Sequence, residues 1–269
     1  MTDFGGSAAS FHASPDSTPD PTLRRAAEGG CDAARDGASD RGLERQRMVR
    51  EQLRARGIGD ERVLAAFARL PREAFVAARD QAQAYADRPL AIGLDQTISQ
   101  PYMVALMTQV LQLSGSETVL EIGTGSGFQT AILSALAARV YSVERHPRLS
   151  AHAGGVLARL GCGNVLLRTG DGSEGWPEFA PFDRVLITCA APAPPPALLD
   201  QLADGGRLVA PLGDRDTQRV TIVDRVGDRF RTGYSDECRF VPLIGRAGFG
   251  EDVPRAEADE HRGGAAGSP

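Results

Sequence analysis

Apolar residues recur every three or four positions in three segments before residue 115, and this spacing predicts three amphipathic helices. The first is predicted to end at Gly57, since glycine tolerates the left-handed conformation of a helix end. The second starts after Asp60 as its N-cap and stops at Pro71. The third starts near Pro101, because proline is tolerated in a first helical turn. The predicted apolar stripes are Leu43, Met48, Val49 and Leu53; Val63, Phe67 and Leu70; and Met103, Leu106, Met107 and Val110.

From Thr118 the pattern changes to short apolar runs that alternate with helical runs. This alternation is typical of βαβ units and predicts an α/β fold with a doubly wound, mainly parallel sheet. Residues 218–235 instead read as two alternating strands joined at Gly227–Asp228, which predicts an antiparallel C-terminal hairpin. The other predicted strands cover 118–123, 139–145, 164–171, 182–190 and 206–213, and the predicted helices between them cover 128–138, 147–161 and 196–206.

The two ends of the chain differ from its centre. Residues 1–40 and 251–269 are rich in small and polar residues and contain few large apolar ones. Such segments bury too little surface to offset their ordering entropy, so we expect two disordered, solvated tails. A single domain is therefore predicted over residues 41–250, with a helical lead-in before its sheet.

Composition excludes some functions. The chain has 269 residues and a formal net charge of −5, without the basic surplus that nucleic-acid binding requires. Its four histidines and four cysteines show no metal-ligand spacing, so we expect no metal. No secretory leader pattern opens the sequence, and the longest apolar stretch, residues 186–199, contains four prolines. We therefore expect a cytoplasmic protein without membrane or nucleic-acid partners.

The segment "VLEIGTGSGFQT" (residues 119–130) is a predicted strand followed by a glycine-rich turn and a helix. Such a turn presents backbone N–H groups where a ligand can approach closely. The dinucleotide fingerprint GxGxxG would need a glycine at Phe128, whereas the GxGxG spacing after an acidic strand residue is the pattern of S-adenosylmethionine-dependent methyltransferases. The alternative is that these glycines merely turn the chain. The predicted cofactor-binding residues here are Glu121, Gly123, Thr124, Gly125, Ser126 and Gly127.

Two further acidic positions follow predicted strands. Glu144 ends the next strand, about twenty residues beyond the loop, where a carboxylate can accept hydrogen bonds from both ribose hydroxyls of an adenosine. The alternative is a solvated charge at a strand end or a helix start. Asp171 and Gly172, in "TGDGSEG", follow the third strand of the series and are predicted to lie near the adenine, although acidic turns are common after strands.

Several segments together resemble one family, the protein-L-isoaspartate O-methyltransferases, from about Met48 to Gly245. The pieces "TISQP" and "RFVPL" are the most specific, since the glycine loop would match any methyltransferase of this kind. The matching segments are "MVREQLRARGIGDERVLAAFARLPREAFV", "YADRPLAIGLDQTISQPYMVALM", "VLEIGTGSGFQTAIL", "VYSVER", "GDGSEGWPEFAPFDRVLITCAAP", "GGRLVAPLG" and "RFVPLIG".

The resemblance implies a Rossmann-like class I methyltransferase fold and a repair activity. In that activity S-adenosylmethionine methylates the free α-carboxylate of L-isoaspartyl residues in damaged proteins and peptides. The ester then cyclises without the enzyme to a succinimide, which can reopen to normal aspartate. A carboxylate with a pKa near 4 is already ionised at pH 7, so this chemistry needs no general base. We expect a monomer.

The resemblance also places site residues. It implies that Ser99 lies at the active site as the catalytic residue, where its hydroxyl orients the substrate carboxylate, and that Thr97 shares the substrate side. The alternative is that Ser99 caps the helix near Pro101. "RFVPLIG" (239–245) is either an extended edge for a peptide backbone or an ordinary buried strand. The family often has glycine where this chain has Asp95, which tolerates left-handed dihedrals better than most residues.

Other functions stay open at this level. A relative that esterifies a normal aspartate in a dedicated peptide fits the same residues, as does a module that binds S-adenosylmethionine without turnover. A dinucleotide oxidoreductase is disfavoured by Phe128. Nucleic-acid methylation is disfavoured because "ITCAAP" replaces the Asn/Asp-Pro-Pro-Tyr motif of base-binding enzymes.

Overall fold

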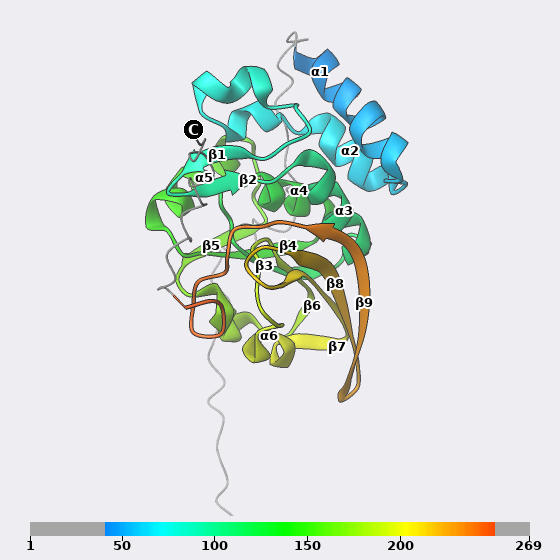
Figure 1. Ribbon diagram of the computed structural model, residues 1–269, viewed down its shortest axis with the longest axis vertical. Coiled ribbons are helices and arrows are strands. Elements are labelled where there is room, and N and C mark those ends of the chain that lie inside the picture. Colours follow the sequence, from blue (N-terminus) through cyan, green and yellow to red (C-terminus); the bar gives the residue numbers. More distant parts are fainter. Residues whose placement is uncertain (1–40, 251–269) are drawn as a thin grey trace, which may run out of the picture.

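The computed structural model describes residues 41–250, and the two predicted tails lie outside this range. Within it, a helical lead-in precedes a sheet that has helices against it (Figure 1). The lead-in consists of α1 (Arg41–Met48), η2 (Val49–Leu53), η3 (Arg54–Arg56), α2 (Glu61–Arg69), η4 (Arg72–Phe75) and η5 (Ala78–Gln83). A short hairpin of β1 (Leu90–Gly93) and β2 (Gln96–Ile98) then leads to α3 (Pro101–Leu111).

The described residues form one seven-stranded sheet, in the order β5-β4-β3-β6-β7-β8-β9. Neighbours from β5 to β7 are parallel, while β7–β8 and β8–β9 are antiparallel, which confirms the predicted mainly parallel sheet with a C-terminal hairpin. The strands are β3 (Thr118–Ile122), β4 (Arg139–Glu144), β5 (Val165–Thr169), β6 (Phe182–Ile187), β7 (Leu202–Gly213), β8 (Gln218–Val226) and β9 (Arg229–Cys238). The remaining elements are α4 (Phe128–Leu136), α5 (Pro147–Arg159), η6 (Gly172–Glu174), η7 (Pro177–Phe179) and α6 (Pro196–Asp200).

Two apolar clusters lie on the two faces of this sheet. The larger joins the lead-in, α3, α4 and α5 to one face and contains Phe67, Phe75 and Phe128. The smaller lies under α6 and contains Phe182 and Leu198. Burial on both faces explains why adjacent apolar residues occur in the parallel strands, such as Val119 and Leu120 in β3, instead of a strict alternation with polar ones.

The lead-in follows the sequence prediction in part. Asp60 caps α2 as predicted, because its carboxylate accepts hydrogen bonds from the backbone N–H groups of Arg62 and Val63. The first predicted helix is divided into α-helical, π-helical and 3-10 segments before Gly57 ends it at φ 94°. Leu43, assigned to the buried stripe, is 72% exposed, since only the later turns of that helix reach the core.

Two other elements differ from the prediction. The helix predicted over 196–206 ends at Asp200, because Leu202 already pairs with Phe182 as the start of β7. The β1–β2 hairpin was not predicted, since its two strands are short and its turn, Leu94–Asp95, carries no glycine. Both turn residues take positive φ, 53° and 56°, so Asp95 adopts the left-handed conformation expected of it.

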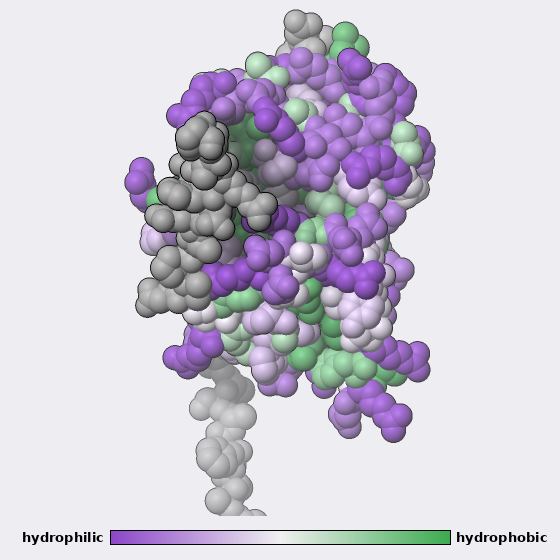
Figure 2. Space-filling model, viewed as in Figure 1, coloured by the Kyte–Doolittle hydropathy of each residue, from purple (hydrophilic) through white to green (hydrophobic). Residues whose placement is uncertain are grey.

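Beyond β9 the chain runs back across the carboxyl ends of the central strands (Figure 1). Its residues 240–244, here called the C-terminal wall, pair with the segment that follows β6: the Ala190 N–H donates to Val241 O, and the Leu243 N–H donates to Ala190 O. On the face shown in Figure 2 the surface is hollowed between the lead-in and the sheet. None of the helices between residues 41 and 250 is long and apolar enough to cross a membrane.

Candidate active site

A cavity opens at the carboxyl ends of β3, β4 and β6. The strand order reverses at β3, whose neighbours β4 and β6 continue the sheet in opposite directions. In open α/β sheets such a switch point is where ligands bind, because the loops on either side separate there. The walls come from β2 and Ser99, the loop after β3, the end of β4, the turn at Gly172, the end of β6, and the C-terminal wall.

The glycine loop lines one side of the cavity through Gly123, Thr124, Gly125 and Ser126. Gly123 has φ 97°, and a Cβ there would lie 2.5 Å from the Thr188 hydroxyl oxygen. That hydroxyl donates to the carbonyl oxygens of Ile122 and Gly123, at 2.9 and 2.6 Å, and so holds the loop against β6. Gly125 has φ 54°, and a Cβ there would make only ordinary contacts, with the Ile92 side chain at 3.6 Å and the Gly123 carbonyl oxygen at 4.0 Å. The loop therefore keeps its backbone open toward the cavity.

Gly127 does not line the cavity. It has φ 88°, and a Cβ on it would lie 3.1 Å from the Cβ of Ala153 in α5. Its glycine is therefore required for close helix packing, which is the role of the third glycine in the dinucleotide fingerprint. Phe128, the next residue, is buried and borders the cavity while its ring packs edge-on against Phe67 and Phe75.

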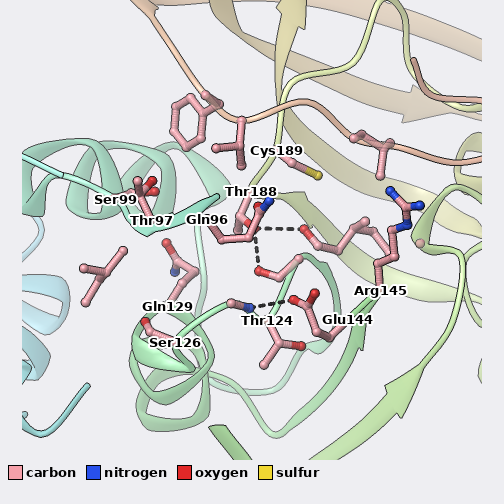
Figure 3. A pocket seen from close by; sticks show the side chains of 18 of the residues that line it. Gln96, Thr97, Ser99, Thr124, Ser126, Gln129, Glu144, Arg145, Thr188 and Cys189 are labelled. Carbon is pink, nitrogen blue, oxygen red and sulfur yellow. Dashed lines mark hydrogen bonds between the residues drawn. The ribbon is translucent and has the colours of Figure 1, made fainter. Parts of the chain in front are cut away.

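Glu144 lies where the sequence predicted it, at the end of β4 and in the cavity wall. Its carboxylate accepts a hydrogen bond from the Gly125 N–H at 2.8 Å (Figure 3) and another from the His146 N–H at 2.9 Å. The first bond ties the carboxylate to the glycine loop. Each carboxylate oxygen can accept more than one hydrogen bond, so acceptor capacity is left for a ligand hydroxyl.

Glu121 occupies a different place from the one predicted. Its side chain is fully buried behind the loop rather than in the cavity wall, and it accepts hydrogen bonds from the Thr130 and Ser142 hydroxyls, each at 2.6 Å. The Ser142 hydroxyl also lies 2.6 Å from that of Thr124, so hydroxyl contacts connect Glu121 with the loop. Burial, with a smaller contribution from the Glu144 carboxylate, raises the pKa of Glu121 to about 7.

Of the two residues predicted near the adenine, only Gly172 lines the cavity. A side chain at Gly172 would collide with Ile122. Asp171 lines a neighbouring pocket instead, and its carboxylate accepts from the Ser173 N–H at 2.8 Å and the Arg246 N–H at 2.7 Å. These hydrogen bonds lower its pKa against the opposing effect of burial, which is the largest single influence. Asp171 thus fastens the chain after the C-terminal wall to the turn at Gly172.

Thr97 and Ser99 face the glycine loop from the opposite wall (Figure 3). Ser99 does not cap α3: the N-cap is Gln100, which makes no capping bond through its side chain. The Ser99 carbonyl oxygen accepts a hydrogen bond from the buried guanidinium of Arg72 at 2.7 Å. The capping alternative is therefore wrong, and the Ser99 hydroxyl is available to a ligand.

Sequence reasoning missed several residues of the cavity. Thr188 and Cys189 follow β6, and Gln129 lies in the first turn of α4. Only their position in the sequence could have indicated them, because residues that follow parallel strands at a switch point lie around the binding crevice. In "RFVPLIG", the main chains of Val241 and Leu243 hydrogen-bond to Ala190, and both residues border the cavity. Its use as an edge for a peptide backbone stays a prediction.

A glycine loop after the first strand of the parallel series, tied to a carboxylate at the end of the second, is the architecture of S-adenosylmethionine-dependent methyltransferases. The residues present fit that donor: the loop backbone is open at Gly125, and Glu144 keeps acceptor capacity for hydroxyl groups.

Within this class, a family model described as "Protein-L-isoaspartate(D-aspartate) O-methyltransferase" matches residues 44–248. The chain belongs to the protein-L-isoaspartate O-methyltransferase family. It is 54% identical over 209 residues to the protein-L-isoaspartate O-methyltransferase 1 of Pelobacter propionicus, covering 76% of this chain and 97% of that protein. It is 52% identical over 207 residues to the enzyme of Koribacter versatilis, covering 77% of this chain and 93% of that protein.

Solved structures agree on the fold. A protein-L-isoaspartate O-methyltransferase structure matches with a TM-score of 0.69 and 29% identity, covering 76% of this chain and 67% of that one. A second, from Plasmodium falciparum and described as a putative enzyme of this kind in complex with S-adenosyl-L-homocysteine, matches with a TM-score of 0.66 and 21% identity, covering 74% of this chain and 98% of that one. The predicted α/β methyltransferase fold and the family are both confirmed. The enzyme is an S-adenosylmethionine-dependent methyltransferase of protein repair.

Proposed function

We propose that the cavity carries out methyl transfer from S-adenosylmethionine to the free α-carboxylate of L-isoaspartyl residues, with Ser99 at the reacting end. One observation carries this proposal: a single cavity has the glycine loop and Glu144 on one wall and Thr97 and Ser99 on the other. Donor and acceptor can therefore meet without a large movement of the protein. We propose residues 41–250 as the methyltransferase domain.

The cofactor half of the site consists of Gly123–Ser126, Glu144 and Gly172. We assign Glu144 to the ribose hydroxyls, because its carboxylate is held by the Gly125 and His146 N–H groups and can accept further bonds. Glu121, Gly127 and Asp171 support this half from behind, since each contacts the loop or an adjoining turn rather than the cavity.

The substrate half consists of Thr97, Ser99 and the C-terminal wall. We assign the Ser99 hydroxyl to one oxygen of the substrate carboxylate, as a charge-assisted hydrogen-bond donor. When bound, S-adenosylmethionine supplies a methyl group on a positively charged sulfur. The substrate carboxylate is ionised at neutral pH, so the protein's part is to orient it and to exclude water from it. The apolar side chains of Val241 and Leu243 border the cavity on that side.

The test of this function is a pair of peptides that differ only in an isoaspartyl or a normal aspartyl residue, incubated with radiolabelled S-adenosylmethionine. We expect label only in the isoaspartyl peptide. Equal labelling of both peptides, or labelling of a single dedicated aspartyl peptide, would overturn the proposed specificity, and labelling of neither would indicate a binding module without turnover.

The role of Ser99 is tested in the same assay. We expect Ser99→Ala to lower kcat/KM for the isoaspartyl peptide about 10- to 100-fold, the effect of one hydrogen bond to a charged group, with unchanged affinity for S-adenosylmethionine. Ser116→Ala is the matched control, because Ser116 is exposed and directly precedes Glu117 and β3, at the end of that strand away from the cavity. Equal activities in the two variants would remove Ser99 from the reaction.

The expectations of a monomer and of a cytoplasmic location stay predictions. Light scattering of the purified chain after size-exclusion chromatography tests the first, and fractionation of the source cells tests the second.

A further inference from the structure

Arg72 is a buried cation next to the active site that the sequence analysis did not single out. It is the first residue of η4, directly after Pro71, and its side chain is 0% exposed. Its guanidinium donates through Nε to the carbonyl oxygen of Ala84 at 2.8 Å and through Nη2 to that of Ser99 at 2.7 Å. One side chain thus joins the lead-in to the residue assigned to the substrate carboxylate.

The same guanidinium also contacts the cofactor side. Its central carbon lies 4.9 Å from the ring centroid of Phe128, in the range of a cation–π interaction. Phe128 opens α4 immediately after the glycine loop and borders the cavity, and its ring is wedged between Phe67 and Phe75. Arg72 therefore lies between Ser99, which directly follows β2, and the helix that follows the glycine loop.

Stability alone does not account for a charge at this position. Nη1 of Arg72 finds no hydrogen-bond partner among residues 41–250, so part of its donor capacity is buried and unused. Burial lowers the pKa of Arg72 to about 9, which still leaves it charged at neutral pH. A buried charge that is incompletely paired can often be replaced by an apolar side chain of similar volume without loss of stability, or with a gain.

We propose that Arg72 is a positioning residue of the methyl transfer: by holding the Ser99 carbonyl while its guanidinium packs on Phe128, it fixes Ser99 relative to the glycine loop. The inference rests on the proposed function, because it concerns the distance between the two halves of that site. A fixed distance is needed because a misplacement of about 1 Å in a reacting group can lower a rate roughly 100-fold.

The decisive variant is Arg72→Met, which fills the buried position with an unbranched apolar side chain and removes the guanidinium with both of its hydrogen bonds to carbonyl groups. We expect its kcat for the isoaspartyl peptide to fall about 100-fold. The dissociation constant for S-adenosylmethionine, measured by calorimetry, should stay within about twofold, because Arg72 contacts no loop residue from Gly123 to Ser126 among its described partners. Arg72→Lys keeps the charge but loses the planar contact with two carbonyl oxygens. Its kcat should therefore lie between those of the wild type and Arg72→Met.

Arg184→Met is the matched control. Arg184 also donates to main-chain carbonyl oxygens: that of its neighbour Asp183 at 2.8 Å, and those of Leu111 at 2.8 Å and Gln112 at 3.2 Å, at the opposite end of α3 from Ser99. If Arg72 only anchored the main chain at one end of α3, as Arg184 does at the other, Arg72→Met and Arg184→Met would lower kcat equally. We expect Arg184→Met to change stability while leaving kcat per folded molecule as in the wild type.

Two results would overturn the inference: a wild-type kcat in Arg72→Met, or equal losses of kcat in the Arg72 and Arg184 variants. If Arg72→Met does not fold, Arg72→Lys decides the question. A wild-type kcat in Arg72→Lys contradicts the proposal. A loss of kcat of tenfold or more, at unchanged affinity for S-adenosylmethionine, supports it. The wild type is assayed first. A wild type without methyl transfer overturns the proposed function and this inference with it, whereas an active wild type with an equally active Arg72→Met overturns the inference alone.

Discussion

At the scale of single residues, three acidic side chains near the glycine loop have separate tasks. Glu144 faces the cavity and accepts from the loop, Glu121 is buried behind the loop, and Asp171 fastens a neighbouring turn. The sequence assigned all three to the cofactor because each follows or ends a parallel strand. Their different burial separates them, since only the side chain that reaches the cavity can contact a ligand.

Glu144 is the residue on which cofactor affinity should depend most. We expect Glu144→Ala to weaken binding of S-adenosylmethionine by about 1.5–3 kcal/mol, the range of hydrogen bonds to a charged group. Isothermal titration calorimetry measures this loss. Glu117→Ala is the control, because Glu117 likewise accepts from two backbone N–H groups, those of Ser114 and Gly115, but on the amino-terminal side of β3. An unchanged affinity in Glu144→Ala would contradict the ribose assignment.

Glu121 should make stability depend on pH in an unusual direction. Its pKa rises from 4.5 to about 7 in the folded chain, first because of burial. The folded state therefore binds more protons than the unfolded state between these values, so this group's contribution to stability is present at low pH and is lost as pH rises through about 7. Glu121→Gln removes the titration.

We expect the stability of Glu121→Gln relative to the wild type to increase by up to about 3 kcal/mol between pH 5 and pH 8. Urea unfolding at both pH values gives the comparison. A difference between the two proteins that is the same at pH 5 and pH 8 would show that Glu121 is ionised throughout this range.

At the scale of elements, the β1–β2 hairpin is the part that local sequence rules describe least well. A two-residue turn with positive φ at both positions favours asparagine and glycine, yet this turn contains Leu94 and Asp95. A leucine in the left-handed region is strained by about 1–2 kcal/mol. The strand after this turn contains Thr97 and leads to Ser99, and both residues line the cavity.

We expect Leu94→Asn to raise the free energy of unfolding by about 1 kcal/mol, because asparagine tolerates the left-handed conformation and Leu94 is 43% exposed and so loses little burial. Leu94→Ala is the comparison, since alanine keeps the strain. Equal stabilities of the two variants in urea unfolding would show that the turn is not strained.

Element boundaries that depend on tertiary contacts could not be predicted from local patterns. The segment after Asp200 has a helical apolar spacing, but pairing of Leu202 with Phe182 makes it a strand. Leu43 fits a helical stripe, yet no core reaches it, and it stays exposed. The parallel strands were predictable because burial on both faces favours apolar runs, and the hairpin was predictable because its two strands alternate and meet at Gly227–Asp228. Arg72 was not predictable, because nothing local shows that a charged residue after a proline is buried.

At the scale of the whole molecule, the cavity unites three parts of the chain that are distant in sequence. Ser99 follows the lead-in and hairpin, the glycine loop and Glu144 belong to the sheet, and the C-terminal wall returns from beyond β9. Unfolding of any one part removes the site. Ligand binding should therefore stabilise the described domain as a unit.

We expect S-adenosylhomocysteine at 100 times its dissociation constant to raise the free energy of unfolding by about 2.7 kcal/mol in a single transition. Calorimetric unfolding measures the shift. NAD at the same concentration is the control and should cause none, since Phe128 occupies the position of the third glycine of a dinucleotide site. Stabilisation by NAD, or a shift confined to part of the transition, would contradict this account.

The central claim is that one cavity presents a methyl donor on the glycine loop to a carboxylate at Ser99. A crystal structure with S-adenosylhomocysteine and an isoaspartyl peptide tests it most directly. We predict the ribose hydroxyls on Glu144 and the α-carboxylate beside the Ser99 hydroxyl, facing the cofactor sulfur. A cofactor bound away from the loop, or a carboxylate that Ser99 does not contact, would contradict the claim.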